Sequence, residues 1–490
     1  MTDYAYSTAA ELAAAMDAGE VSAVELAMAM IARIERLDGD INAICVPDFD
    51  RALAAAGEAD AARSRGEAGP VLGVPMTVKD SIDVAGLPTT WGFPRFKDHV
   101  ATSDAVAVAR LRAAGAVILG KTTVPLALGE FQSFNAIHGT TNNPWDLGRT
   151  PGGSSGGSAA ALAAGFGALS MGSDIGGSLR VPAHFCGVYA HKPSIGLLPL
   201  RGHTFPGARP LPEFGGDLGV IGPMARGAAD LEMMVRLLCD PDEAGPGIAY
   251  RTALRPARHD HLGAFRVLIL ESHPLVPVSS EVRAAIDDLA TRLAASGVTV
   301  RRHSPHLPDL AAGARCYMRL LQSAVAAGFP PAVYAAGVEA AAALDPSDVS
   351  LVAERARGVV LSHRDWVAAD AVRAAQRARW AELFTEVDIV VAPVFSTPAF
   401  PHDHSEPMTK RVIPIDGEEH DYLDQSAWGG IATAPGLPST AVPVTRSAQG
   451  LPIGVQLIGP LLEDHTPIRF AALLEREFGG FTPPPLGASA

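Results

Sequence analysis

The chain has 490 residues, of which 48% are hydrophobic and 19% are charged, and its formal net charge is −14. This composition supports a large buried core and excludes an intrinsically disordered protein. The acidic balance argues against broad binding to nucleic-acid phosphates, which needs clustered lysine and arginine. No uncharged apolar stretch is long enough to span a bilayer, and the first residues lack a secretory signal pattern, so we expect no membrane association.

Cysteine and lysine usage narrow the expected environment and chemistry. The four cysteines are scattered, without the spacing of a metal site or a redox motif. We therefore expect free thiols in a reducing compartment and a cytoplasmic protein. Only a few of the 39 Lys and Arg residues are lysines, and a desolvated lysine can release its proton whereas arginine cannot. The lysines to consider as a base, besides surface or ion-pair roles, are Lys79, Lys97, Lys121, Lys192 and Lys410.

Residues 1–66 are predicted to form a helical layer on the outside of the protein. Thr8 with Glu11, and Ser22 with Glu25, have the spacing of helix capping boxes. Apolar residues recur at helical intervals after the second box, and an alanine-rich helix is predicted to follow.

Residues 67–240 are predicted to form the core that carries the chemistry. The expected elements, in chain order, are a buried strand over 71–78, a helix over 104–114, a strand over 117–119, a loop over 135–157 and a helix over 158–164. This alternation is typical of a sheet covered by helices.

The second half of the chain repeats the α/β style. Residues 241–385 are predicted to be a variable α/β and helical region, and residues 386–490 to supply strands and a helix that complete the core. The expected elements are strands over 265–270, 298–300, 388–394 and 451–458, a helix capped by Ser280, and helices across 311–381. Because the sequence has no linker or internal repeat, we predict one α/β domain over 1–490, with a central twisted mixed β-sheet covered by helices on both faces.

Two segments rich in glycine and serine, residues 150–158 and 172–180, are candidates for chemistry. Gly-Gly-Ser sequences let successive N–H groups converge on one point, where they can hold an oxyanion. Each such donor contributes about 3 kcal/mol of transition-state stabilisation. Phosphate binding and simple tight turns remain alternatives at this point.

A serine nucleophile in either segment needs a base. Neither segment contains histidine, although His184 and His191 lie nearby in the sequence and keep a histidine-based triad open. Lys79 ends a predicted buried strand, where burial can bring the pKa of a lysine close to neutrality. An ion pair of Lys79 with Asp80 or Asp83 is the alternative.

Three blocks together resemble the amidase signature hydrolases. They are residues 73–80 (GVPMTVKD), 151–158 (PGGSSGGS) and 172–183 (GSDIGGSLRVPA). Each block alone is weak, but their order and spacing make the combined pattern specific. The resemblance covers residues 8–240 well and 385–475 more loosely.

The resemblance implies a Ser-cisSer-Lys triad and an acyl-enzyme intermediate. Ser178 is the implied nucleophile, Lys79 the base, and Ser154 the relay, which follows a cis peptide bond from Gly153. The implied oxyanion hole consists of the N–H groups of Ile175, Gly176, Gly177 and Ser178.

Other positions match supporting and substrate-binding residues of the same family. Ser155, Asp174 and Arg180 are implied to hold the lysine and the glycine loop in place. The implied substrate-binding residues are Leu128, Phe131, Gly152 and Gly153. Leu126, Phe134, Phe205 and Phe214 are further apolar residues near this region. If several of them face the pocket, an apolar or aryl acyl group is favoured, whereas the alternative is that they belong to the core.

The expected function is therefore hydrolysis of a carbon–nitrogen amide bond in a small-molecule substrate, with esters, anilides and carbamates also open. The resemblance implies no metal and no organic cofactor, and it allows a homodimer. The alternative function is the amidase-like subunit of an aminoacyl-tRNA amidotransferase.

Three other patterns in the sequence compete with this interpretation. Residues 115–122 (GAVILGKT) fit the phosphate-loop pattern, but their centre is a predicted strand. Residues 152–156 (GGSSG) fit a nucleophile elbow, which would make Ser154 the nucleophile but needs a strand directly before it. The histidine pairs His259 with His261 and His402 with His404 could ligate a metal, but both lie in polar or proline-flanked loops.

Overall fold

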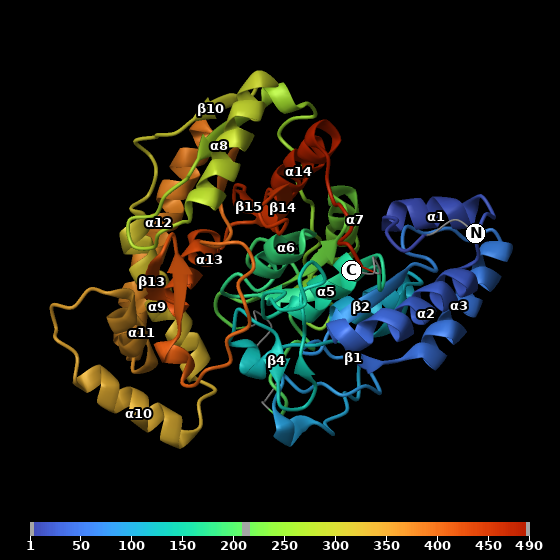
Figure 1. The fold of residues 1–490 in the computed structure, drawn as a ribbon, viewed down its shortest axis with the longest axis horizontal. Helices are drawn as coiled ribbons and strands as arrows, with labels where there is room; N and C mark the ends of the chain where they lie inside the picture. The colour runs from blue at the N-terminus through green and yellow to red at the C-terminus, as the bar shows by residue number, and fades with distance from the viewer. Residues whose placement is uncertain (1–3, 208–215, 487–490) are drawn as a thin grey trace.

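The computed structural model describes residues 4–207 and 216–486, and its centre is a β-sheet built from both halves of the chain (Figure 1). Its strands are β1 (Ile44–Pro47), β2 (Pro75–Lys79), β3 (Val117–Thr122), β6 (Leu169–Asp174), β7 (Tyr189–Lys192), β8 (Val220–Ala225), β9 (Arg266–Ile269), β10 (Thr299–Arg301), β11 (Ile389–Pro393), β14 (Ser439–Arg446) and β15 (Pro452–Ile458). In the described residues they form one 11-stranded sheet in the order β1-β3-β2-β6-β8-β7-β14-β15-β11-β9-β10.

The sheet is mixed. Strands β3, β2 and β6 pair in parallel, as do β11, β9 and β10, whereas the strands between these two groups pair antiparallel. The hairpin β14–β15 lies between β7 and β11, so a late segment joins the strands of the two halves. Two short hairpins lie outside the sheet, β4 (Phe134–Asn135) with β5 (Gly139–Thr140) and β12 (Val412–Ile415) with β13 (Glu418–Asp421).

Helices cover the sheet (Figure 1). They are α1 (Ala9–Asp17), α2 (Ala23–Ile41), α3 (Phe49–Ser64), α4 (Val106–Ala113), α5 (Gly156–Ala164), α6 (Arg180–Cys186), α7 (Ala228–Leu238), α8 (Ser280–Ala295), α9 (Leu310–Ala326), α10 (Pro331–Ala342), α11 (Leu351–Val359), α12 (His363–Glu386), α13 (Ser426–Thr433) and α14 (His465–Phe478). This arrangement confirms the predicted α/β fold with a central mixed sheet.

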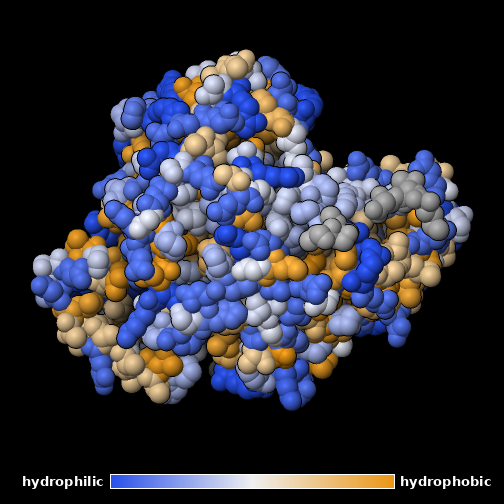
Figure 2. All heavy atoms as spheres, in the orientation of Figure 1, coloured by the Kyte–Doolittle hydropathy of each residue, from blue (hydrophilic) through white to orange (hydrophobic). Residues whose placement is uncertain are grey.

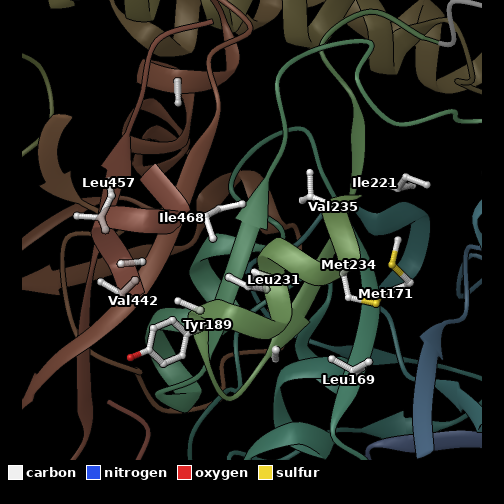
Figure 3. Packing of buried hydrophobic residues seen from close by; sticks show 14 of the residues in the cluster. Leu169, Met171, Tyr189, Ile221, Leu231, Met234, Val235, Val442, Leu457 and Ile468 are labelled. Atoms are coloured by element: carbon white, nitrogen blue, oxygen red, sulfur yellow. The ribbon is translucent and has the colours of Figure 1, made fainter. Parts of the chain in front are cut away.

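The core lies between the sheet and its helices. Figure 3 shows Leu231 and Val235 of α7 and Ile468 of α14 beside Leu169 of β6 and Leu457 of β15. All five side chains are buried. Because burial of apolar area is the main favourable term in folding, this cluster holds the strands that position the candidate site.

The first helices form as their sequence predicts. Both capping boxes are present, since Thr8 and Glu11, and Ser22 and Glu25, exchange side-chain and backbone hydrogen bonds. The segment predicted as purely helical also contributes β1, which pairs antiparallel with β3 at one end of the sheet. This strand was missed because four residues are too few to show an alternating pattern.

Two predicted boundaries were wrong by a few residues. The strand expected from residue 71 begins only at Pro75, because residues 71–74 form a turn in which Val74 N–H donates to the Val71 carbonyl at 3.0 Å. Helix α8 is capped by Ser279 rather than Ser280, and the Ser279 hydroxyl accepts from the Val282 N–H.

On the face shown in Figure 2, hydrophilic residues are interspersed with smaller hydrophobic groups. Among the helices described, none combines the length and the apolar composition that a bilayer crossing requires.

Candidate active site

Lys79 is the last residue of β2, between the parallel strands β3 and β6, and its side chain is fully buried. Its Nζ lies 2.7 Å from Ser154 Oγ and 2.9 Å from both Ser155 Oγ and Ser173 Oγ. The amine is therefore surrounded by hydroxyl groups from the two glycine- and serine-rich segments.

Burial lowers the pKa of Lys79 to about 7, although the charges of Asp174 and Asp80 act to raise it. Within the described residues, no carboxylate lies at ion-pair distance from this amine. The carboxylate of Asp80 instead accepts hydrogen bonds from Thr90 and from the Trp91 N–H. The alternative ion pair of Lys79 with Asp80 or Asp83 is therefore not formed, and the amine can be neutral near pH 7.

The segment before α5 carries Ser154 on a loop rather than on a strand. The Gly153–Ser154 peptide bond is cis, as the resemblance implies. A Cβ on Gly153 would lie 2.4 Å from the carbonyl oxygens of Glu130 and Gln132, so only glycine fits there. Gly152 is similarly confined by the backbone of α6, with φ of 87°. Both glycines thus bring the backbone of residues 130–132 against the serine segment.

The second segment links β6 to α6. Asp174 ends β6, and its carboxylate accepts from the Gly177 N–H at 2.8 Å and the Leu179 N–H at 3.1 Å. It also forms a buried ion pair with Arg180 at 2.9 Å. Burial would raise the pKa of Asp174, but Arg180 and these hydrogen bonds outweigh it and hold the pKa at about 2. The carboxylate therefore stays charged and fixes the loop.

Ser178 lies in this loop, next to the first segment. The Ser155 N–H donates to the Ser178 carbonyl at 3.1 Å, which holds the two segments together. Within the described part of the chain, Ser178 Oγ makes no hydrogen bond, although Ser178 is largely buried. Its hydroxyl is thus not tied to another protein group.

Three of the four N–H groups predicted as oxyanion donors have no protein acceptor in the part of the chain that the structure describes. They are those of Ile175, Gly176 and Ser178. The fourth, from Gly177, is bonded to Asp174. The loop therefore presents three unpaired donors to one small region, which is the property of an anion-binding nest.

Residues from distant segments support the loop from behind. Tyr317 of α9 donates from its hydroxyl to the Ile175 carbonyl at 2.9 Å. Arg180 donates to Gln456 Oε1 of β15 at 2.8 Å and to Thr433 Oγ1 of α13 at 2.9 Å. Sequence reasoning missed these three partners, because none lies in a motif. It also missed Ser173, whose position inside the third block was an available signal.

The predicted substrate-binding residues have different surroundings. Leu128 is half-buried at the end of a short 3-10 helix, Leu126–Leu128. Phe131 is buried, with its ring 5.2 Å from that of Phe395 and 5.5 Å from that of Tyr422, which is the environment of a core residue. Phe214 lies outside the described residues.

Competing candidates fail on geometry in the described residues. His184 bonds to Thr397 and Gly454, and His191 to Thr440 and Asp464, so neither histidine serves the serine segments. The phosphate-loop pattern is wrong because its second half is β3. The nucleophile elbow is wrong because no strand precedes Ser154.

The histidine pairs considered as metal ligands make other contacts. His259 Nε2 lies 3.2 Å from Asp388 Oδ2, and the ring of His404 stacks on Phe134 at 3.8 Å between centroids. No group of three or more His, Cys, Asp or Glu side chains within the described ranges could hold a metal ion.

Comparison with known proteins agrees with this geometry. A sequence model described as Amidase matches residues 25–467 of the chain. The chain belongs to the amidase family. The matched region contains all three sequence blocks, so the resemblance to amidase signature enzymes is confirmed.

Individual relatives of this amidase family member are named for different activities. The matching subunit of the glutamyl-tRNA(Gln) amidotransferase of Roseiflexus sp. (strain RS-1) is 33% identical over 94% of this chain and 93% of its own length. Indoleacetamide hydrolase of Bradyrhizobium diazoefficiens is 32% identical over 96% of this chain and 86% of its own length. The solved structure of a bacterial aryl acylamidase of the amidase signature family has a TM-score of 0.80 and 25% identity, covering 97% of this chain and 96% of that one.

Proposed function

We propose that this member of the amidase family hydrolyses a carbon–nitrogen amide bond, with Ser178 as nucleophile, Ser154 as proton relay and Lys79 as base. The observation that carries the proposal is the buried Lys79 amine, whose pKa is about 7 and which lies 2.7 Å from Ser154 Oγ. A general base works best when its pKa is near the operating pH.

The proposed first step acylates the enzyme. Neutral Lys79 takes the proton of Ser154 as Ser154 takes the proton of Ser178, and Ser178 Oγ then attacks the amide carbonyl carbon. The carbonyl oxygen becomes an oxyanion, which accepts hydrogen bonds from the unpaired N–H groups of Ile175, Gly176 and Ser178. We leave Gly177 out of this set because its N–H already serves Asp174.

The remaining steps release both products. The proton on Lys79 returns through Ser154 to the leaving nitrogen, and the carbon–nitrogen bond breaks to give an amine and an ester on Ser178. A water molecule, deprotonated along the same relay, attacks the ester and yields a carboxylic acid and free Ser178. Protons balance over the cycle, so the lysine is neutral again at its end.

Covalent labelling tests the assignment of the nucleophile. A fluorophosphonate probe, followed by peptide mass spectrometry, is expected to label Ser178. The Ser178→Ala protein should lose both labelling and amide hydrolysis, whereas Ser64→Ala, at an exposed helix end, should keep both. Labelling of Ser154 in place of Ser178 would contradict the proposal.

A second candidate function follows from one relative, the amidotransferase subunit that is 33% identical to this chain. In that case the same site would release ammonia from an amide donor for use by partner subunits. Assay of the purified chain with simple amides, anilides, carbamates and esters distinguishes the two. Hydrolysis without partner or ATP supports the stand-alone amidase, and activity that appears only with partner subunits supports the alternative.

A further inference from the structure

A strained turn lies directly beside the buried lysine. Trp91 has a φ of 52°, in the left-handed region that residues other than glycine rarely adopt. Its N–H donates to Asp80 at 2.7 Å, and Asp80 also accepts from the Thr90 hydroxyl at 3.0 Å. On the other side, the buried amine of Lys121 donates to Thr89 Oγ1 at 2.8 Å. Two buried charged side chains thus hold this one turn in an unfavourable conformation.

A second strained segment is attached to the first. Ala127 and Leu128 have φ values of 57° and 59°, and the Ala127 N–H donates to the Trp91 carbonyl at 2.9 Å. Strained backbone of this kind persists only where its surroundings enforce it, and it concentrates at sites that clamp ligands. Trp91 and Leu128 are therefore parts of one fixed unit, and both side chains are half-buried.

The indole ring of Trp91 lies on the side of the lysine. Its centroid is 5.0 Å from the ring of His203 and 5.7 Å from that of Phe205. Burial and the nearby Lys79 lower the pKa of His203 to about 3, which places His203 within the electrostatic range of the amine. In the described part of the chain, the buried Trp91 Nε1 and His203 Nε2 have no hydrogen-bond partner. Such unpaired buried atoms are rare in folded proteins unless water or a ligand serves them.

The outer side of the same aromatic cluster is already occupied. The guanidinium of Arg95 lies over the rings of Phe93, Phe96 and Phe205, at 5.0, 4.7 and 5.6 Å from their centroids. In contrast, no guanidinium or amine of the described residues lies over the ring of Trp91. The Trp91 ring is thus the member of the cluster that is left for a further planar group.

We propose that Trp91 is a specificity-determining residue whose indole ring packs against an aromatic group of the amide substrate, with Leu128 on the adjoining wall. This inference rests on the proposed function and narrows its substrate class to amides that carry an aryl group. Aromatic rings gain from offset or edge-to-face packing beyond the area they bury, and one such pair corresponds to about a tenfold preference. The aryl group can belong to the acyl part or to the amine part of the substrate.

Matched substrates test the proposal and separate the two placements. We would measure kcat/KM for phenylacetamide against hexanamide, and for acetanilide against N-hexylacetamide. The wild-type protein is expected to prefer the aryl member of one pair by about tenfold or more. Trp91→Ala should abolish that preference while hexanamide turnover changes little, and Trp91→Phe should restore most of it. The matched control is Trp366→Ala, on the half-buried Trp366 of α12, which should leave the preference unchanged.

A binding measurement keeps the inference separate from the proposed chemistry. In the Ser178→Ala background, calorimetry should show the aryl amide binding about tenfold more tightly than its alkyl partner, and the Trp91→Ala change should remove the difference. If Trp91→Ala does not fold, as judged by its melting curve, Leu128→Ala replaces it and should lower the same preference. Equal losses for aryl and alkyl amides would overturn the inference but leave the proposed function intact. If no amide is hydrolysed, the proposed function fails, and equal binding of aryl and alkyl amides then overturns this inference as well.

Discussion

The amine of Lys79 is surrounded by three serine hydroxyls and is shielded from water and from carboxylates. Because the charged form is disfavoured, its pKa falls from 10.5 to about 7. A base must be unprotonated, so acidification below pH 7 removes the active form. We therefore expect kcat/KM to fall about tenfold for each pH unit below 7 and to level off above it.

The pH profile needs a control, because burial also lowers the pKa of Lys192 to about 7. The amine of Lys192 donates to the Pro193 carbonyl at 2.9 Å and contacts no serine hydroxyl of the described residues. The inflection near pH 7 should therefore persist in Lys192→Gln. A profile that is flat from pH 5.5 to 7 in the wild-type protein would contradict the assignment of Lys79.

Removal of the amine is a second prediction at this scale. Lys79→Ala should lower turnover by at least about 100-fold, the lower range of general-base effects. Steady-state assays at pH 8 would measure it, with Lys97→Ala at an exposed position as the control. Near-normal turnover of Lys79→Ala would exclude this lysine as the base.

At the scale of elements, the loop from β6 to α6 depends on the buried pair of Asp174 and Arg180. Arg180→Met would leave the Asp174 carboxylate buried without a cation, which costs about 3–5 kcal/mol of unfolding free energy. Urea denaturation should show this loss, together with reduced amide hydrolysis. The control is Arg65→Met, which breaks an exposed pair with Glu67 and should cost less than about 1 kcal/mol. Equal stability losses in both variants would contradict the anchoring role.

The same loop shows how far sequence reasoning reaches. The blocks around Lys79, Ser154 and Ser178 are contiguous, and their strands and turns follow from local composition, so their convergence could be predicted. The partners Tyr317 and Gln456 could not, because each lies in a segment whose own sequence only indicates a helix or a strand. Their role depends on which distant elements pack together, and periodicity carries no such information.

At the scale of the whole molecule, one sheet joins segments that the sequence suggested as separate regions. Strands β9 and β10 come from residues 241–385, and β14 and β15 connect them to β7 of the earlier region. The predicted region boundaries therefore do not separate independent sheets. We missed β7 and β8 because β7 has four residues and β8 contains Gly222 and Pro223, which interrupt a strand pattern.

This shared sheet predicts cooperative unfolding. Chains of this size often unfold in stages when their domains are independent. Here we expect a single transition in guanidinium, with coincident midpoints by far-UV circular dichroism and tryptophan fluorescence. Two separated transitions would show that the halves are stable without each other.

The place of β14 and β15 in the middle of the sheet also affects biosynthesis. Every other strand of this sheet is translated before residue 439, so β7 and β11 leave the ribosome with one edge each unpaired. Open strand edges are templates for association with other chains. A nascent chain of this protein therefore carries two adhesive edges until its final hairpin emerges, and that interval is when a holding chaperone would matter most.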